Sequence, residues 1–286
     1  MEANSVRLVT DTTACLPPGF AEAHGVEVVP QIVRFGEEAF LEGVEISYAD
    51  YIQRLKSSAS QAFTAAAPPA EFIKAYRRQL AIGSTILSLH PSNEISGTIR
   101  SANIAKSEGF ADADIRIIDS RSVAACLGAM VQHAAAWIEA GQSADEIIAK
   151  LEALFPRGRM YFLVPTLEYL QRGGRVGGAA ALLGGVLQIK PLLELRNGRV
   201  EPLERVRTYN RAYERLKELV SANCPRTAEA ELCVMHADNP AEAERLAGDL
   251  RAALGFSDIP IFAVGAAITT HAGPGTIGVG FFVSQQ

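Results

Sequence analysis

The residues that could bind or transform a small molecule lie in short polar segments beside apolar runs. Ser96-Gly97-Thr98 follows the apolar run that ends at Leu89 and begins a helical pattern. A helix N-terminus presents unpaired N–H groups and partial positive charge, so Ser96, placed as the N-cap, could help to bind an anion. A plain N-cap with no ligand explains the same pattern.

Thr64 is a second candidate. It precedes Pro68-Pro69, which introduce a helix, and we expect it in a loop between two α/β elements, where its hydroxyl could face a cleft. A solvated or capping threonine is the alternative interpretation.

A glycine-rich segment contains Arg175, with Gly173-Gly174 before it and Gly177-Gly178 after it. Glycine allows the backbone to approach a ligand closely, and an arginine there can direct two donors at a carboxylate or phosphate. His271 lies beside Gly273-Pro274-Gly275, after an apolar strand. A surface turn around Arg175 and a simple turn histidine are the alternatives.

The segment from Arg157 to Arg215 is basic. It contains eleven Lys or Arg against five Asp or Glu, an excess of six in a chain whose net charge is −5. This asymmetry indicates an anion site or an acidic partner surface. A chance cluster spread over several faces gives the same count.

Several motifs with known chemistry are absent from the sequence. It has no Walker A loop, no G-x-S-x-G segment and no G-x-G-x-x-G after the first strand. The four cysteines form no C-x-x-C pair, and H-E-x-x-H does not occur. We therefore expect no cofactor, no metal site and packing cysteines.

Composition bounds the class of protein. The chain has 286 residues, of which 48% are hydrophobic and 21% charged, as in folded globular proteins. Its mild acidity argues against a nucleic-acid binder. No apolar run approaches the roughly 18 residues of a membrane span, and the first five residues do not resemble a signal peptide. These features predict a cytoplasmic protein without stable membrane insertion.

The first half alternates apolar strands with helical patterns, which predicts an α/β domain with a largely parallel sheet. Ser143 and Glu146 form a capping box for a helix that Pro156 and Gly158 end. We place the domain boundary there, giving domains 1–157 and 158–286. The predicted strands are 6–10, 26–33 (interrupted by Pro30), 85–89 and 115–118, and the predicted helices are 48–57, 69–81, 97–108 and 122–140.

The second half mixes hairpin and helix signals, which predicts an α+β domain. Asn197-Gly198 between apolar runs indicates a β-hairpin over 192–200. Apolar residues at helical spacing indicate an amphipathic helix over 209–220. The other predicted elements are strands 160–164, 231–235, 259–264 and 276–283 and a helix over 240–254.

Taken together, these segments resemble the DegV family, the fatty acid-binding proteins that serve as carrier subunits of bacterial fatty acid kinase. The resemblance runs nearly end to end, and its specificity lies in the order and spacing of its motifs. They are Thr10-Asp11-Thr12-Thr13, Ser96-Gly97-Thr98, Ile118-Asp119-Ser120, Thr166-Leu167-Glu168-Tyr169-Leu170, Gly173-Gly174-Arg175-Val176, Ile189-Lys190-Pro191 and His271-Ala272-Gly273-Pro274-Gly275.

The resemblance implies a DegV-like, two-domain fold that buries the acyl tail of a long-chain fatty acid between the domains and presents its carboxylate to a separate kinase, which makes the acyl phosphate. It implies no catalytic residue in this chain. Ser96 and Thr64 resemble the hydroxyl ligands of the carboxylate. Arg175 and His271 resemble the basic residues near the head group, and Arg207 resembles a surface arginine that engages the kinase.

The loop around Thr64 departs from the family. It has Ala65 where the family has a serine, and only Thr64 matches the Pro-Thr-Thr-Ser pattern. Loss of a hydrogen bond to a charged carboxylate costs about 1.5–3 kcal/mol. We expect head-group binding through Thr64 and Ser96, with a strength or lipid preference that can differ from that of the family.

Two other functions fit the same residues. One is a hydrolase or an acyl/phosphoryl transferase with Ser96 as nucleophile and His271 as base, which requires the two side chains to be within hydrogen-bond reach. The other is a ligand-sensing module without a kinase partner. The acyl chain's length and saturation, the oligomeric state and the partner's identity do not follow from the sequence.

Overall fold

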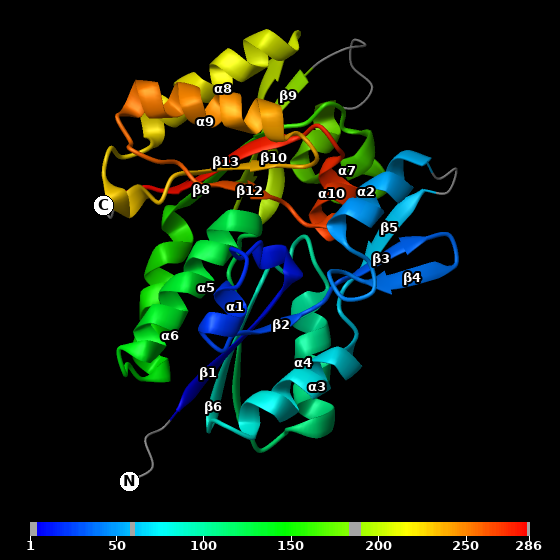
Figure 1. The fold of residues 1–286 in the computed structure, drawn as a ribbon, viewed down its shortest axis with the longest axis vertical. Helices are drawn as coiled ribbons and strands as arrows, with labels where there is room; N and C mark the ends of the chain where they lie inside the picture. The colour runs from blue at the N-terminus through cyan, green and yellow to red at the C-terminus, as the bar shows by residue number, and fades with distance from the viewer. Residues whose placement is uncertain (1–4, 58–60, 183–189, 285–286) are drawn as a thin grey trace. The chain divides into compact units, whose positions relative to one another are not determined.

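The computed structural model describes residues 5–57, 61–182 and 190–284. The chain divides into two compact units, Met1–Pro156 and Arg157–Gln286. Each unit has its own sheets and core (Figure 1). Ile189 of the Ile189-Lys190-Pro191 segment lies outside the described residues.

The N-terminal unit is built on a four-stranded parallel sheet of order β2-β1-β6-β7. Because all four strands run the same way, their carboxyl ends share one edge of the sheet. Asp11, His90 and Asp119 are the last residues of three of these strands and therefore lie along that edge. The strands are β1 (Val6–Asp11), β2 (Glu27–Val29), β6 (Thr85–His90) and β7 (Asp114–Asp119).

Helices cover both faces of this sheet (Figure 1). On one face, α3 (Pro69–Leu80) and α4 (Thr98–Gly109) bury a core with Val9, Ile86 and Ile115. On the other lie α5 (Ala124–Glu139) and α6 (Ala144–Leu154), and the predicted capping box of Ser143 and Glu146 begins α6. A short helix, α1 (Phe20–Ala23), follows β1, after a 3₁₀ turn at Thr12–Ala14.

The interruption predicted at Pro30 within 26–33 is confirmed, but the expectation that the two parts form one strand is wrong. Proline has no N–H to donate to a sheet, and Pro30 separates two strands that belong to different sheets. After it, β3 (Ile32–Phe35) is the centre of a small antiparallel sheet of order β4-β3-β5. Its partners are β4 (Glu38–Leu41) and β5 (Ala62–Ala65), and Tyr51 of α2 (Tyr48–Ser57) packs against Phe35.

The C-terminal unit contains a six-stranded sheet of order β10-β9-β8-β13-β11-β12, antiparallel except for the β11–β12 pair. The predicted hairpin is confirmed, because Asn197 and Gly198 both adopt positive φ, 51° and 80°, between β9 and β10. The strands are β8 (Gly158–Leu163), β9 (Lys190–Arg196), β10 (Arg199–Val206), β11 (Cys233–His236), β12 (Ile261–Ala263) and β13 (Ile277–Phe282).

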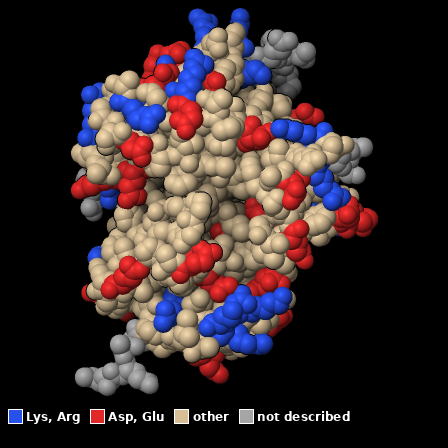
Figure 2. Space-filling view, viewed as in Figure 1, with Lys and Arg blue, Asp and Glu red and all other residues tan. Residues whose placement is uncertain are grey.

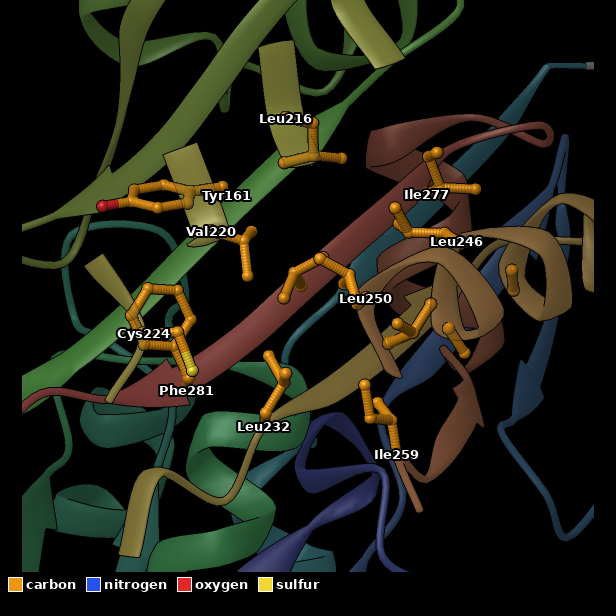
Figure 3. Close-up of a cluster of buried hydrophobic side chains, with 14 of the residues drawn as sticks. Tyr161, Leu216, Val220, Cys224, Leu232, Leu246, Leu250, Ile259, Ile277 and Phe281 are labelled. Carbon is orange, nitrogen blue, oxygen red and sulfur yellow. The ribbon is translucent and has the colours of Figure 1, made fainter. Parts of the chain in front are cut away.

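The main core of this unit lies between the sheet and two helices, α8 (Tyr209–Asn223) and α9 (Pro240–Leu254). Figure 3 shows its side chains, among them Leu216 of α8, Leu250 of α9 and Phe281 of β13. Leu192 faces this core, whereas the next residue, Leu193, faces a second apolar cluster on the opposite side of the strand. Other helical segments are α7 (Glu168–Arg172), α10 (Ala266–Ala272) and 3₁₀ turns at Phe155–Arg157, Gly177–Leu182 and Ala228–Ala230.

The predicted fold class is confirmed: a parallel α/β sheet in the N-terminal unit is followed by a second, mixed sheet with helices. Within the described ranges, no helix has both the length and the apolar character needed to cross a bilayer.

Candidate functional site

Ser96 lies directly before α4, but it is not the N-cap. Gly97 occupies that position, and Thr98 is the first helical residue. The Ser96 hydroxyl accepts a hydrogen bond from the Thr98 backbone N–H at 3.3 Å and lies 2.7 Å from Thr98 Oγ1. The predicted cap is wrong by one residue because the serine bonds two positions ahead in a local turn. Ser96 is half-buried, whereas Thr98 is fully buried.

Gln31 connects three segments of the N-terminal unit. Its side-chain N–H₂ donates to Thr98 Oγ1 and to Asp11 Oδ1, both at 2.9 Å. Its side-chain oxygen accepts from the backbone N–H of Ala67 at 3.1 Å. Only 3% of Gln31 is exposed, and all three of its side-chain hydrogen-bonding groups have partners.

Asp11 is the centre of this buried network. Its Oδ1 accepts from Gln31 and from the backbone N–H and hydroxyl of Thr13, at 3.0 and 2.6 Å. Its Oδ2 lies 2.7 Å from His90 Nδ1. The carboxylate is fully buried, and four hydrogen bonds offset the loss of its hydration.

A chain of hydrogen bonds leads to Asp11 from the interior. The Tyr76 hydroxyl lies 2.8 Å from Ser88 Oγ, which lies 2.6 Å from His90 Nε2. Burial raises the pKa of Tyr76 well above its ordinary value, so the hydroxyl is neutral. The hydrogen-bonded series Tyr76–Ser88–His90–Asp11 is continuous, with both ring nitrogens of His90 engaged. Ser88, His90 and Asp11 have the order of a catalytic triad, but all three are fully buried, so they form a structural support.

Thr64 does not lie in a loop, as the sequence predicted. It is in β5, paired with Val33 of β3, because the small antiparallel sheet extends over this segment. Three residues later, Ala67 is bonded to Gln31. A Cβ built on Gly97 would lie 3.5 Å from that of Ala66, so the chain following Thr64 runs against the chain following Ser96.

The C-terminal unit brings Arg175 and His271 together around Gly173. Gly173 ends α7, and a Cβ placed on it would lie 2.0 Å from His271 Nδ1, so the imidazole packs directly against backbone. The Arg175 guanidinium donates to the Gly173 carbonyl at 2.6 Å. His271 lies in α10, a short helix that the sequence did not predict.

Burial, together with the nearby charge of Arg175, lowers the pKa of His271 to about 4. The imidazole is therefore neutral at neutral pH. Of this pair, only Arg175 carries a positive charge, and His271 can act toward a ligand only as a neutral hydrogen-bonding group.

Arg207 is exposed between β10 and α8, directly before Thr208, whose hydroxyl caps α8. Part of the basic excess of 157–215 is neutralised within the unit. Arg215 contacts Glu204 and Glu218 at 2.8 and 2.7 Å, and Figure 2 shows acidic and basic side chains side by side over α8.

Within the units, Thr64 and Ser96 lie on neighbouring segments of the N-terminal one, and Arg175 and His271 are adjacent in the C-terminal one. Sequence reasoning missed Gln31, Thr98 and His90 as parts of the network. The available signals were a lone glutamine in the apolar run after Pro30 and polar residues at the ends of two parallel strands. In the part of the chain that the structure describes, no three His, Cys, Asp or Glu side chains gather as a metal ion requires.

The fold and these two sites define a two-unit α/β protein whose parallel sheet carries a buried polar network at its carboxyl edge. Residues 5–284 match the family model described as an uncharacterised protein of the DegV family. A DegV domain-containing protein of Streptomyces coelicolor is 41% identical over 96% of this chain and 97% of its own length, and the protein DegV of Bacillus subtilis is 32% identical over 96% and 98%. The chain belongs to the DegV family.

Solved structures agree with this assignment. A fatty acid-binding DegV family protein from Thermus thermophilus is 32% identical, with a TM-score of 0.88 over 98% of this chain and all of that one. The structure of DegV from B. subtilis, described as a fatty acid-binding protein, is 30% identical, with a TM-score of 0.87 over 98% of this chain and 99% of that one.

Proposed function

We propose that this protein binds a long-chain fatty acid, buries the acyl tail between its two domains, 1–157 and 158–286, and presents the carboxylate to a separate kinase that forms the acyl phosphate. The protein itself performs no chemistry in this role and acts in the cytoplasm. One observation carries the proposal: a chain similar over its whole length to fatty acid-binding DegV proteins has, just before α4, a half-buried serine hydroxyl whose hydrogen bonds among the described residues are both to Thr98.

The direction of the Ser96–Thr98 hydrogen bond supports this role. Thr98 Oγ1 already accepts from Gln31, and Thr98 is fully buried, so its hydroxyl hydrogen needs an acceptor. Among the hydrogen bonds of the described residues, the acceptor for this hydrogen is Ser96 Oγ. Ser96 therefore accepts twice from Thr98, and its own hydrogen remains for a carboxylate.

The C-terminal unit supplies the charge in this proposal. Arg175 is a permanent cation on a segment fixed by its bond to the Gly173 carbonyl. His271, kept neutral by burial, adds a neutral hydrogen-bonding group beside it. Thr64 and Ser96 would bind the carboxylate directly, with Arg175 and His271 near the head group.

The acyl tail would provide most of the affinity. Each buried methylene contributes about 0.8 kcal/mol, so a dozen contribute about 10 kcal/mol before the cost of ordering the chain. The polar groups orient the head group and prevent an unpaired carboxylate from being buried.

Lipid occupancy tests the site. We expect the protein to co-purify with a fatty acid that mass spectrometry detects in the native complex and after denaturation. Ser96→Ala combined with Thr64→Val removes two hydroxyls and should weaken rebinding of oleate by about 10- to 100-fold. Ser107→Ala is the matched control, since that exposed hydroxyl lies on the same helix and, among the described residues, bonds only to the Ile104 carbonyl. A folded double variant with unchanged occupancy would contradict the assignment of Thr64 and Ser96.

Partner docking requires a separate test. Arg207→Glu should reduce acyl phosphate formation by a bacterial fatty acid kinase while leaving oleate occupancy unchanged. Arg226→Glu makes the same charge change at another exposed arginine of the C-terminal unit and should have no effect. Equal activity of the Arg207→Glu and wild-type proteins with the kinase would contradict the docking role. Release of free acid from acyl esters, abolished by Ser96→Ala, would instead favour the hydrolase.

A further inference from the structure

The buried network of the N-terminal unit ends on the residue proposed to bind the carboxylate. From Asp11, Gln31 donates one amide hydrogen back to Oδ1 and the other forward to Thr98 Oγ1. Thr98 in turn lies 2.7 Å from Ser96 Oγ. The series of contacts begins at a fully buried carboxylate and ends at a half-buried hydroxyl.

The identity of each group fixes the direction of these bonds. The Ala67 N–H can only donate, so the Gln31 side-chain oxygen must face it and the Gln31 N–H₂ must face Asp11 and Thr98. Because Thr98 accepts from Gln31, its own hydrogen is directed to Ser96. An amide turned the other way would place its oxygen against the carboxylate.

The same glutamine also fixes the second hydroxyl segment. Ala67 is three residues beyond Thr64 and is fully buried, and its N–H bonds to Gln31. One side chain therefore ties the end of β1, the segment after β5 and the first turn of α4.

We propose that Thr98 and Gln31 are positioning residues of the fatty acid carboxylate site, holding the Ser96 hydroxyl as an acceptor toward the protein so that its hydrogen is available to the bound anion. This inference rests on the proposed function. In this proposal, neither Thr98 nor Gln31 contacts the ligand. They lower the cost of binding by fixing a donor beforehand, as preorganised sites do.

Thr98→Val tests the proposal, since valine keeps the shape and removes the hydroxyl. Titrations with oleate and with oleyl alcohol, which have the same tail, separate head-group recognition from tail burial. We expect oleate affinity to fall about tenfold and oleyl alcohol affinity to change little, because charge-assisted bonds are the stronger ones. Thr98→Ser keeps the hydroxyl and should restore the ratio of the two affinities.

Thr10→Val is the matched control. Thr10 is fully buried in the same sheet, and its hydroxyl donates to the Leu89 carbonyl at 2.8 Å, so its removal also deletes a buried hydrogen bond. It should lower stability without changing the oleate-to-alcohol ratio. Gln31→Met provides a second test should Thr98→Val fail to fold, and we expect the same loss of discrimination from it.

The outcomes are distinguishable. An oleate-to-alcohol affinity ratio that stays unchanged in Thr98→Val, or in Gln31→Met should Thr98→Val not fold, would overturn the positioning role. Binding of oleate by the wild-type protein would still uphold the proposed function in that case. Wild-type protein that, once stripped of lipid, takes up neither compound would overturn the proposed function and this inference with it.

Discussion

The two candidate regions hold their side chains by different physical means. In the N-terminal unit, Gln31 and Thr98 are fixed by directed hydrogen bonds that lead to one buried carboxylate, Asp11. In the C-terminal unit, His271 is fixed by close packing against the backbone of Gly173. The first arrangement should be sensitive to the removal of polar atoms, and the second to the addition of a single methyl group.

Asp11→Ala should have the largest effect. It leaves the Gln31 amide, the Thr13 amide and hydroxyl, and the Nδ1 atom of His90 without their Asp11 partner in a buried setting. Each unsatisfied buried group costs about 1–3 kcal/mol, so we expect a loss of at least about 3 kcal/mol in the free energy of unfolding, measured by urea denaturation.

Asp119→Ala is the control at the neighbouring strand end. Within the described ranges, that side chain accepts only from the backbone N–H groups of Asn93 and Arg121, and it is half-buried, so water can replace it. We expect a loss of about 1 kcal/mol. Comparable losses for the two variants would contradict the central role of Asp11 and leave both aspartates with the role of shaping loops.

Gly173→Ala tests the C-terminal region. The backbone at Gly173 has φ −75°, which alanine adopts freely, so any effect comes from the collision of the new Cβ with the imidazole. Overpacking typically costs about 1–3 kcal/mol, and displacement of the ring should also raise the pKa of His271 from about 4. Thermal unfolding and an NMR titration of the imidazole measure the two effects.

Gly97→Ala is the matched change in the N-terminal region. Its Cβ would meet that of Ala66 at an ordinary 3.5 Å, so we expect only the cost of a poorer N-cap, about 0.5–1 kcal/mol. If Gly97→Ala were the more harmful of the two, the distinction between a bonded and a packed region would be wrong.

The parallel sheet and most helices could be predicted from the sequence because periodicity and caps are local signals. Ser143 and Glu146, for example, form the predicted capping box. The single strand over 26–33 was wrong because the sheet that β3 joins is set by pairing with β4 and β5, which are distant or weakly patterned segments. Thr64 was placed in a loop for the same reason, since Ala62-Phe63-Thr64-Ala65 carries little strand signal of its own.

The residues of the candidate site also divide into those with a local sequence signal and those without one. Ser96 and Arg175 are recognisable because each lies in a short segment with a characteristic local pattern. The supporting residues are not, because their roles come from contacts between segments far apart in the chain. Gln31 reaches Asp11, Ala67 and Thr98, and only the fold brings these together. The packing of His271 against Gly173 likewise joins α10 to the end of α7.

The pH dependence of stability probes the packed region without a substitution. The pKa of His271 is about 4 in the folded protein and about 6.5 in the unfolded chain, so the unfolded state takes up the proton first. Stability should therefore fall as the pH drops from about 6.5 toward 4, by about 2 kcal/mol at pH 5, and the loss from this group should level off below pH 4. His271→Gln should remove this part of the dependence in urea titrations at several pH values.

Arg175→Met should raise the imidazole pKa only partly, because burial is the larger cause and the cation the smaller. A full return to about 6.5 in that variant would instead make the charge of Arg175, rather than packing against Gly173, the feature that keeps His271 neutral.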